Sequence, residues 1–491
     1  MEVSIRADLC CDSVYSYLKL RASQPVAWSA LMQYDNVGRP AHQRVRHNGR
    51  TLLDKSYLWG DNLRLLQTLD TINRRSVRYD YDTFGSLSGA VYGDGSCQWR
   101  NPDAMGNVYD SPDRTDRSYA RGGQLREDRK WRYYYDSHGN LVLKTMRRSG
   151  PSLDAGMRDE FLAWQSGDYA YTWQSNGMLR SVTRPDGKTV TFRYDALGRR
   201  IEKVFDGRVY RCLWDGDVIL HEWEYAETGE ITLDRPEPVE NLITWVYDSD
   251  SYVPTAKIVG DKHYSIISDH IGRPVQAYDD NGNIIWQADY DIYGNLRNLH
   301  GSRQFIPFRQ LGQYEDEEIG LYYNRFRYYD SRIGNYICQD PIRLAGNNPT
   351  LYGYVGDSNS RLDLFGLSGR GGTIHRSIQD QLEKDLGNLG KNVETEVQII
   401  LKNGRSRFGD VVVRNDIGDI IEVHQIGDMR SRGGFRPSSR ERGAIMDIRE
   451  ALGDDVRIVF HDKEQRVTLI DPDKADNWKE PSKRYRYSGC S

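Results

Sequence analysis

The chain has 491 residues, which is more than one compact domain usually holds and favours two or three units. Its 67 basic and 71 acidic residues give a formal net charge of −4, so the overall charge points neither to nucleic acid nor to a membrane surface. The mean hydropathy is −0.73 and no run of 18 apolar residues occurs, which excludes a membrane-spanning helix.

Residues 1–30 are not assigned to any class of structure. Glu2, Asp8 and Asp12 lie where a signal peptide would need its apolar core, so we expect no Sec-type export signal and synthesis in the cytoplasm. The cysteines include no CxxC pair, which argues against a disulfide framework and against a zinc knuckle. These six residues are Cys10, Cys11, Cys97, Cys212, Cys338 and Cys490.

Residues 31–307 contain several copies of the motif Tyr-Asp-x-x-Gly. The chain holds 33 Tyr and 46 Gly, an excess typical of short strands joined by tight turns. In each copy an alternating strand ends at the tyrosine, the aspartate can hydrogen-bond the turn backbone, and the glycine takes the positive φ of a tight hairpin. The uneven spacing of the copies predicts a wound antiparallel sheet and not a strict solenoid. The copies are Tyr34–Gly38, Tyr81–Gly85, Tyr135–Gly139, Tyr194–Gly198 and Tyr290–Gly294.

Residues 308–367 carry the most specific signature of the chain. They include the runs Gly320–Arg325 (GLYYNR) and Arg327–Asp330 (RYYD), then Asp340-Pro341, and they end on Gly366-Leu367. With the preceding repeats, this segment resembles the core of RHS polymorphic toxins and its core-end motif, and the repeats are similar to the YD repeats of toxin-complex C subunits and teneurins. The resemblance covers roughly residues 30–367. It implies a β-rich YD-repeat shell, in which a long sheet winds around a cargo polypeptide.

In RHS proteins the core-end motif is an aspartate-dependent self-cleavage site. The resemblance implies that Asp340 and Asp363 are the paired carboxylates, that Arg327 supports them, and that the bond after Leu367 is cut. Two close carboxylates can share a proton, so that one polarises the carbonyl while the other activates water. The chain departs from the family's Asp-Pro-x-Gly-Leu at one position, where Leu364 replaces the proline.

Residues 368–491 are predicted to form a separate toxin domain, joined to the shell by a glycine-rich run. Their 22 basic and 21 acidic residues nearly cancel, so charge alone does not indicate nucleic acid. Apolar periodicity and turn residues, including Asn403-Gly404, predict the order α-β-β-β-α-β-β. The predicted helices are 374–389 and 438–452, and the predicted strands are 393–401, 408–413, 419–426, 456–461 and 466–470.

This order, with an acid on the second strand and another on the third, resembles the PD-(D/E)xK restriction-endonuclease-like superfamily. The resemblance implies that Asp410 and Glu422 hold Mg²⁺ or another divalent cation for phosphodiester hydrolysis. The family's lysine is replaced by His424, with Gln425 beside it, so these two residues are the remaining catalytic candidates. Glu383 is a candidate outer contact to the metal, and Arg405 and Arg407 are candidates for phosphate binding.

The sequence therefore favours a toxin nuclease that acts in interbacterial competition, with type VI secretion as the expected route. The expected partners are a nucleic acid substrate, a cognate immunity protein and a component of the secretion apparatus that exports the chain from the producer cytoplasm to a target cell. A zinc deaminase is disfavoured, because it needs Pro-Cys-x-x-Cys and only Cys490 follows Cys338. An ADP-ribosyltransferase, an RNase based on His375, His424 or His461, and a truncated, inactive gene end stay open.

Overall fold

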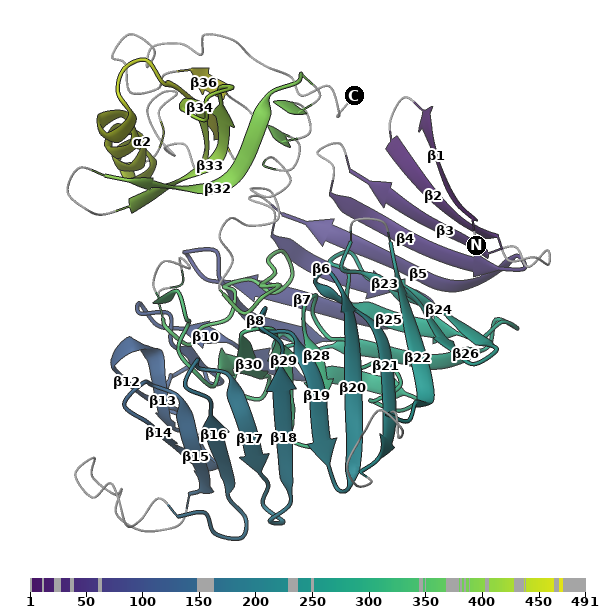
Figure 1. Ribbon diagram of the computed structural model, residues 1–491. Helices are drawn as coiled ribbons and strands as arrows, with labels where there is room; N and C mark the ends of the chain where they lie inside the picture. The colour runs from purple at the N-terminus through teal and green to yellow at the C-terminus, as the bar shows by residue number, and fades with distance from the viewer. Residues whose placement is uncertain are drawn as a thin grey trace. The chain divides into compact units, whose positions relative to one another are not determined.

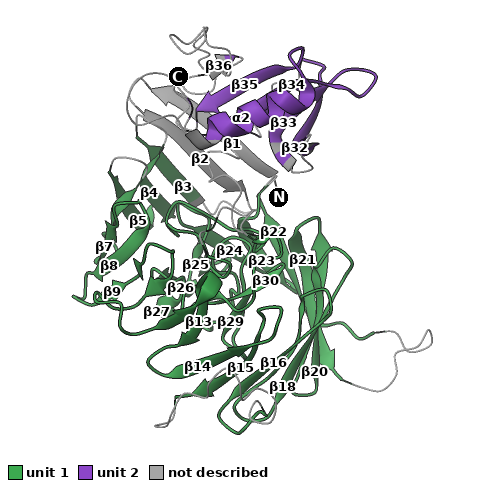
Figure 2. Ribbon diagram, turned by 90° about the vertical axis from the view of Figure 1, so that its left-hand side faces the viewer, with its two compact units in different colours: residues 1–370 green, residues 371–491 purple. Residues whose placement is uncertain are grey.

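The chain divides into two compact units, Met1–Arg370 and Gly371–Ser491, drawn in different colours in Figure 2. The sequence analysis places this boundary after Leu367. The computed structural model describes residues 2–10, 13–21, 28–35, 39–60, 64–147, 163–227, 237–248, 251–343, 348, 350–367, 379, 382–383, 386–387, 389–401, 406–427, 437, 439–462 and 468–470.

The first unit begins with a nine-stranded antiparallel sheet in which every strand pairs with the next one along the chain (Figure 1). The first two strands lie in residues 1–30, the segment that the sequence left unassigned. The strands are β1 (Glu2–Cys10), β2 (Ser13–Arg21), β3 (Trp28–Tyr34), β4 (Pro40–His47), β5 (Arg50–Trp59), β6 (Leu65–Asp70), β7 (Arg75–Tyr81), β8 (Leu87–Tyr92) and β9 (Cys97–Trp99).

A second sheet of sixteen strands follows, again in strict chain order and antiparallel throughout. This arrangement confirms the β-rich wound sheet predicted from the repeats. Its strands are β12 (Ser118–Ala120), β13 (Gln124–Glu127), β14 (Trp131–Tyr135), β15 (Leu141–Met146), β16 (Tyr169–Trp173), β17 (Leu179–Thr183), β18 (Thr189–Tyr194), β19 (Arg200–Phe205), β20 (Arg208–Asp215), β21 (Val218–Ala226), β22 (Glu240–Tyr247), β23 (Pro254–Val259), β24 (Lys262–Ser268), β25 (Pro274–Tyr278), β26 (Ile284–Tyr290) and β27 (Leu296–His300).

Three smaller elements complete the first unit: a two-stranded sheet, a short 3₁₀ turn at Arg121–Gly123, and a four-stranded sheet from the core-end segment. The smaller strands are β10 (Asn101–Pro102), β11 (Val108–Tyr109), β28 (Tyr314–Asp316), β29 (Leu321–Asn324), β30 (Arg327–Asp330) and β31 (Asn335–Tyr336).

The turn at Asp195 shows how one repeat folds. Its Oδ1 accepts hydrogen bonds from the backbone N of Leu197 and of Arg199, each over 2.9 Å, which closes an Asx-type turn. Gly198 takes φ +73°, a conformation that most side chains avoid. The pairing register shifts between Arg193 and Tyr194, where the strand that leaves the turn has one extra residue, Ile201. The motif therefore specifies a hairpin with a bulge opposite the aromatic residue.

An aromatic side chain links many of these hairpins to the preceding one. The hydroxyl of Tyr194 donates to the carbonyl of Leu179 over 2.8 Å, and Leu179, which pairs with Trp173, is the neighbour of the extra residue in the bulge of the preceding repeat. Seven bonds of this kind, between 2.6 and 3.0 Å, run through both large sheets, and in three of them a tryptophan N–H is the donor. The donors are Trp59, Tyr81, Trp173, Tyr194, Trp214, Tyr247 and Tyr290.

The core-end strands pack on the apolar face of the sixteen-stranded sheet. Leu321, Tyr323 and Tyr328 join Leu179 and Phe192 in one cluster, and each of these five side chains is at most 2% exposed. Burial of each such side chain stabilises the fold by about 1.5–3 kcal/mol. The core-end segment is thus an integral part of the shell's core.

Buried ion pairs also hold the core-end segment to this sheet. Lys144 Nζ lies 3.0 Å from Asp330 Oδ2, with both side chains 1% exposed, and Lys203 Nζ lies 3.2 Å from Asp316 Oδ1. Burial alone would raise the pKa of Asp330, but the charges of Arg332 and Lys144 outweigh it and hold that pKa below its ordinary value. Removal of one partner from such a pair leaves an uncompensated buried charge.

The second unit contains a five-stranded sheet, in the order β32-β33-β34-β35-β36, and a helix, α2. β34 and β35 are parallel and the other pairs are antiparallel, so α2 forms the crossover between two parallel strands. No helix among the described residues is long and apolar enough to cross a lipid bilayer. The elements are β32 (Asn392–Ile400), β33 (Ser406–Arg414), β34 (Ile420–Gly427), α2 (Ser439–Leu452), β35 (Arg457–Asp462) and β36 (Thr468–Ile470).

Each face of this sheet carries its own apolar cluster. Val412, Val423 and Phe460 pack with Ile445 and Ile448 of α2 on one face. On the other face, Val411, Val413 and Ile426 pack with Leu382 and Leu386. Those two leucines belong to the predicted first helix; Leu382–Glu383 and Leu386–Gly387 are helical, and much of the rest of 374–389 lies outside the described residues, as does Asn403-Gly404.

Two glycines with nearly the same backbone conformation test how closely the core-end segment is packed. Gly198 has φ +73° and Gly207 has φ +74°. An alanine at either position would have the same unfavourable left-handed backbone conformation, which costs about 1–2 kcal/mol. A Cβ on Gly198 would lie 2.7 Å from Cε1 of Phe326, whereas a Cβ on Gly207 would meet nothing within 4 Å. Urea unfolding should therefore show Gly198→Ala less stable than Gly207→Ala by about 1–3 kcal/mol. Equal midpoints would contradict this packing.

Candidate functional site

The three predicted self-cleavage side chains meet at one point in the first unit. Nη2 of Arg327, the first residue of β30, lies 3.0 Å from Oδ2 of Asp340 and 3.2 Å from Oδ2 of Asp363. All three side chains are buried, at 1%, 2% and 3% exposure. One guanidinium thus joins two carboxylates that are 23 residues apart in the sequence, in surroundings where charge interactions are strong.

Hydrogen bonds hold the segment before the predicted cleavage point against these groups. The N–H of Leu367 donates to Oδ1 of Asp363 over 2.9 Å, and Nε of Arg327 donates to the carbonyl of Gly366. The N–H of Phe326 donates to the carbonyl of Phe365 over 3.1 Å. Gly366 has φ +67°, and a Cβ there would lie 2.5 Å from the carbonyl oxygen of Asn324. The backbone on both sides of Gly366 is therefore fixed beside the carboxylates.

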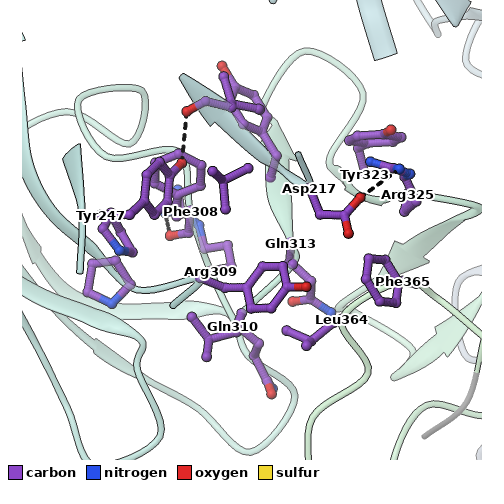
Figure 3. Close-up of a pocket in the computed structure, with 18 of the residues that line it drawn as sticks. Asp217, Tyr247, Phe308, Arg309, Gln310, Gln313, Tyr323, Arg325, Leu364 and Phe365 are labelled. Carbon is purple, nitrogen blue, oxygen red and sulfur yellow. Dashed lines mark hydrogen bonds and ion pairs between the residues drawn. The ribbon is translucent and has the colours of Figure 1, made fainter. Parts of the chain in front are cut away.

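Leu364 and Phe365 line a pocket on the side of this segment (Figure 3). The pocket has a volume of about 50 Å³, and its other walls include Tyr247, Phe308 and Tyr252, whose ring lies edge-on to Phe365 at 6.2 Å. A Cβ on Gly312 would collide with the carbonyl of Leu364. Leu364 occupies the place of the family's proline, and this close approach holds its backbone even though that ring is missing.

Two further polar residues at this site were not singled out from the sequence. Tyr336 donates from its hydroxyl to Oδ2 of Asp363 over 2.8 Å, and Nδ2 of Asn324 donates to that hydroxyl over 2.7 Å. Burial, together with the charge of Asp363, raises the pKa of Tyr336 well above its ordinary value. Both residues lie in the core-end motif, yet only their contacts in the fold distinguish them from its other tyrosines and asparagines.

In the second unit, Glu422 is the centre of a cluster of charges on β34. Its Oε2 lies 2.7 Å from Nζ of Lys391, and its Oε1 lies 3.4 Å from Nη1 of Arg457. His424, two residues further along the strand, has Nε2 at 3.5 Å from Oε1 of Glu422. Lys391, the residue before β32, is 31 residues away in the sequence and brings an ammonium group to this carboxylate. No spacing rule pointed to that residue.

His424 also pairs with His461 of β35. Nδ1 of His424 lies 2.8 Å from Nε2 of His461, and the rings are stacked with centroids 5.1 Å apart. Burial lowers the pKa of each to about 3, assisted for His424 by the charges of Lys391 and Arg457 and for His461 by that of His424. Both imidazoles are therefore neutral at pH 7, and one donates a hydrogen bond to the other.

Asp410 lies in a separate hydrogen-bond network from Glu422. Its Oδ2 accepts from the backbone N of Ile426 over 2.6 Å, and its carbonyl accepts from Nε2 of Gln379 over 3.1 Å. Across residues 389–401, 406–427 and 439–462, no three His, Cys, Asp or Glu side chains gather in a way that could hold a metal ion. A cation at Glu422 would have to displace Lys391. A Mg²⁺ shared by Asp410 and Glu422 therefore stays a prediction.

Three other predicted residues lie in the described part of the second unit. Glu383 is exposed, and Gln425, on the same strand as Glu422, is 5% exposed. Arg407 donates from Nε and Nη2 to Oδ2 of Asp447 on α2, over 2.8 and 2.6 Å, so its guanidinium is already paired with a carboxylate. Arg405 and His375 lie outside the described residues.

Comparison with known proteins decides the family of the first unit. Residues 15–350 match the model of the teneurin YD-shell family. The chain belongs to that family. Relatives include double-stranded DNA deaminase toxin A of Burkholderia cenocepacia, 30% identical over 68% of this chain and 24% of that one. Probable deoxyribonuclease RhsB of Dickeya dadantii is 33% identical over 51% of this chain and 16% of its own length.

Among solved structures, the Photorhabdus luminescens Tc holotoxin pore with the TccC3 D651A mutation matches 73% of this chain and 21% of that one, at 16% identity and a TM-score of 0.39. The chain thus spans a quarter or less of these proteins. The two relatives are named for different activities, a deaminase and a deoxyribonuclease, although both are similar to this chain. Membership of the YD-shell family therefore leaves the chemistry of residues 371–491 open.

The buried histidine pair predicts that acid destabilises the second unit of this YD-shell protein. Both pKa values are about 3 in the fold and near 6.5 in an unfolded chain, so the unfolded state binds more protons as pH falls below 6.5. The stabilisation is full above pH 6.5 and is lost progressively down to pH 3, by about 2 kcal/mol for each histidine between pH 7 and pH 5.

Pulse proteolysis in urea, which measures how much of the 371–491 fragment stays intact, should show this loss of stability as a lower urea midpoint at pH 5 than at pH 7. In His461→Gln the midpoint should depend less on pH, because one of the two buried imidazoles is gone. An unfolding midpoint that stays constant from pH 7 to pH 5 would contradict the burial of a neutral pair.

Proposed function

We propose that this chain is the C-terminal part of an RHS-type polymorphic toxin, whose YD-shell region frees residues 368–491 as an effector. The observation that carries the proposal is the buried contact of Arg327 with Asp340 and Asp363, beside the hydrogen-bonded backbone of Gly366 and Leu367. The toxin names of two relatives support the same reading.

The proposed release is hydrolysis of the peptide bond between Leu367 and Ser368. One carboxylate takes a proton from water as the water oxygen attacks the carbonyl carbon of Leu367, and the other, protonated, polarises that carbonyl. The C–N bond then breaks, the amine of Ser368 takes up a proton, and Leu367 keeps the new carboxylate. Arg327 holds both side chains and the carbonyl of Gly366 in place.

For the effector we propose a nuclease. A relative named as a probable deoxyribonuclease supports it, and so does the cluster around Glu422, which brings together two partly exposed cations, Lys391 and Arg457. An RNase in which one histidine acts as an imidazolium acid is disfavoured, because burial keeps both His424 and His461 neutral at pH 7. A divalent cation is a requirement to be tested, and no step is assigned to it.

The same proposal defines partners and location. The effector acts on DNA or RNA in a target cell, a cognate immunity protein protects the producer, and a secretion apparatus exports the toxin from the producer cytoplasm without a Sec signal. The inactive gene end is the competing hypothesis, and it predicts neither cleavage nor nuclease activity.

Cleavage is tested with Asp340→Asn and Asp363→Asn in the full chain, refolded from urea at pH 7. The wild type should yield a fragment that begins at Ser368, and each variant should lose cleavage by at least about 100-fold, because the pair can no longer share a proton. Asp416→Asn, an exposed acid in the turn between β33 and β34, is the control. Cleavage of both variants at the wild-type rate would refute the assignment.

Nuclease activity is tested with the cleaved wild type and with Asp410→Ala and Glu422→Ala, on plasmid DNA and total RNA, with Mg²⁺ or EDTA. We expect degradation by the wild type and at least about a 100-fold loss in Glu422→Ala, since its charge holds the cationic cluster together. Loss in EDTA and in Asp410→Ala would establish the metal requirement. Intact substrates after incubation with folded wild-type protein would refute the nuclease.

A further inference from the structure

Tyr336 ends β31 with its side chain buried among the core-end tyrosines, at 1% exposure. Its hydroxyl oxygen accepts a hydrogen bond from Nδ2 of Asn324, so the single hydroxyl hydrogen is directed to the other neighbour, Oδ2 of Asp363. Asn324 is 0% exposed and is held by a second bond from Nδ2 to the carbonyl of Asp363, over 2.9 Å. The amide therefore fixes the direction in which the hydroxyl donates.

The ring of Tyr336 contacts the other charged partner. Cζ of Arg327 lies 3.7 Å from the ring centroid, a cation–π contact in a desolvated setting. The side chain of Tyr336 therefore touches the guanidinium with its face and the carboxylate of Asp363 with its edge. The first contact needs only an aromatic ring, and the second needs the hydroxyl.

We infer that Tyr336 is a positioning residue for self-cleavage, whose hydroxyl, oriented by Asn324, fixes the carboxylate of Asp363 beside the backbone of Leu367. The inference rests on the proposed cleavage after Leu367. Oδ1 of Asp363 accepts from the N–H of Leu367 and Oδ2 accepts from Tyr336, so the two bonds together set the rotation of the carboxylate. Loss of the hydroxyl frees that rotation while the ring stays in place.

The phenol acts as a hydrogen-bond donor and not as an acid. Burial and the charge of Asp363 raise the pKa of Tyr336 well above its ordinary value, so the hydroxyl keeps its proton throughout the pH range of the experiment. A donor of this kind stabilises the ionised form of the carboxylate that accepts from it. Its removal should therefore change the pH at which cleavage begins as well as the rate.

Tyr329 provides a matched control in the same aromatic cluster. Its side chain is also 1% exposed, its ring lies 5.8 Å from that of Tyr336, and its hydroxyl donates to the carbonyl of Tyr293 over 2.8 Å. Tyr329→Phe therefore removes a buried hydroxyl of the same kind from a neighbouring tyrosine, with a backbone carbonyl as its partner in place of a carboxylate. Any general effect of the lost hydroxyl on folding should appear in both variants.

The experiment follows self-cleavage of the full chain after dilution from urea, from pH 4 to pH 9, by the appearance of the fragment that begins at Ser368. Tyr336→Phe should cleave about 10- to 100-fold more slowly than the wild type. The acid limb of its pH–rate profile should move to higher pH by about one unit. Tyr329→Phe should keep the wild-type rate and profile.

Asn324→Ser is the second variant, since it leaves Tyr336 in place but removes the amide that orients the hydroxyl, and it should slow cleavage in the same direction. Thermal melting establishes that each variant is folded. Wild-type rate and profile in folded Tyr336→Phe, or equal changes in Tyr336→Phe and Tyr329→Phe, would overturn the inference alone. Absence of cleavage in the wild type at every pH would overturn the proposed cleavage and the inference with it.

Discussion

The hydrogen bond from an aromatic side chain to a carbonyl of the preceding repeat is the contact on which the shell depends. A bulge at the end of a strand interrupts the pairing ladder, and a buried carbonyl without a donor costs about 1–3 kcal/mol. Here bulges recur along both large sheets. At seven described positions a Tyr or Trp of the following repeat donates to the carbonyl next to the bulge, as Tyr194 does to Leu179 and Trp214 to Arg200. These bonds connect successive hairpins within the sheets.

The core-end segment packs against one face of this sheet. Its apolar side chains fill the sheet's inner cluster, and its acids, Asp316 and Asp330, pair with Lys203 and Lys144 of the sheet. That anchoring fixes the backbone around Arg327 from both sides, so two carboxylates distant in sequence meet at one guanidinium. Because these charges are buried away from water, they interact strongly with one another. Small changes in the orientation of the carboxylates would therefore alter proton transfer between them and water. The proposed cleavage site is therefore built into the shell's core.

The sequence predicted the sheet well because its information is local. A Tyr-Asp-x-x-Gly run specifies turn, bulge and aromatic donor within five residues, although Trp59, Trp173 and Trp214 replace the tyrosine and escape a search for the motif. In the second unit, apolar periodicity located β32 to β36 and α2 to within a few residues. The partners of the candidate site residues could not be predicted. Lys391, the residue before β32, contacts Glu422 on β34, and no rule of spacing connects two such positions. Motifs identify which side chains carry charge, and tertiary packing decides which of them meet.

The central claim is that water, directed by the core-end carboxylates, cuts the chain after Leu367. The most direct measurement is refolding of the full chain in H₂¹⁸O, followed by mass spectrometry of both fragments. The account predicts one ¹⁸O atom in the new carboxylate of Leu367, none in the fragment that begins at Ser368, and neither fragment from Asp363→Asn. An intact chain, a cut at another bond, or a Leu367 carboxylate without ¹⁸O would contradict it.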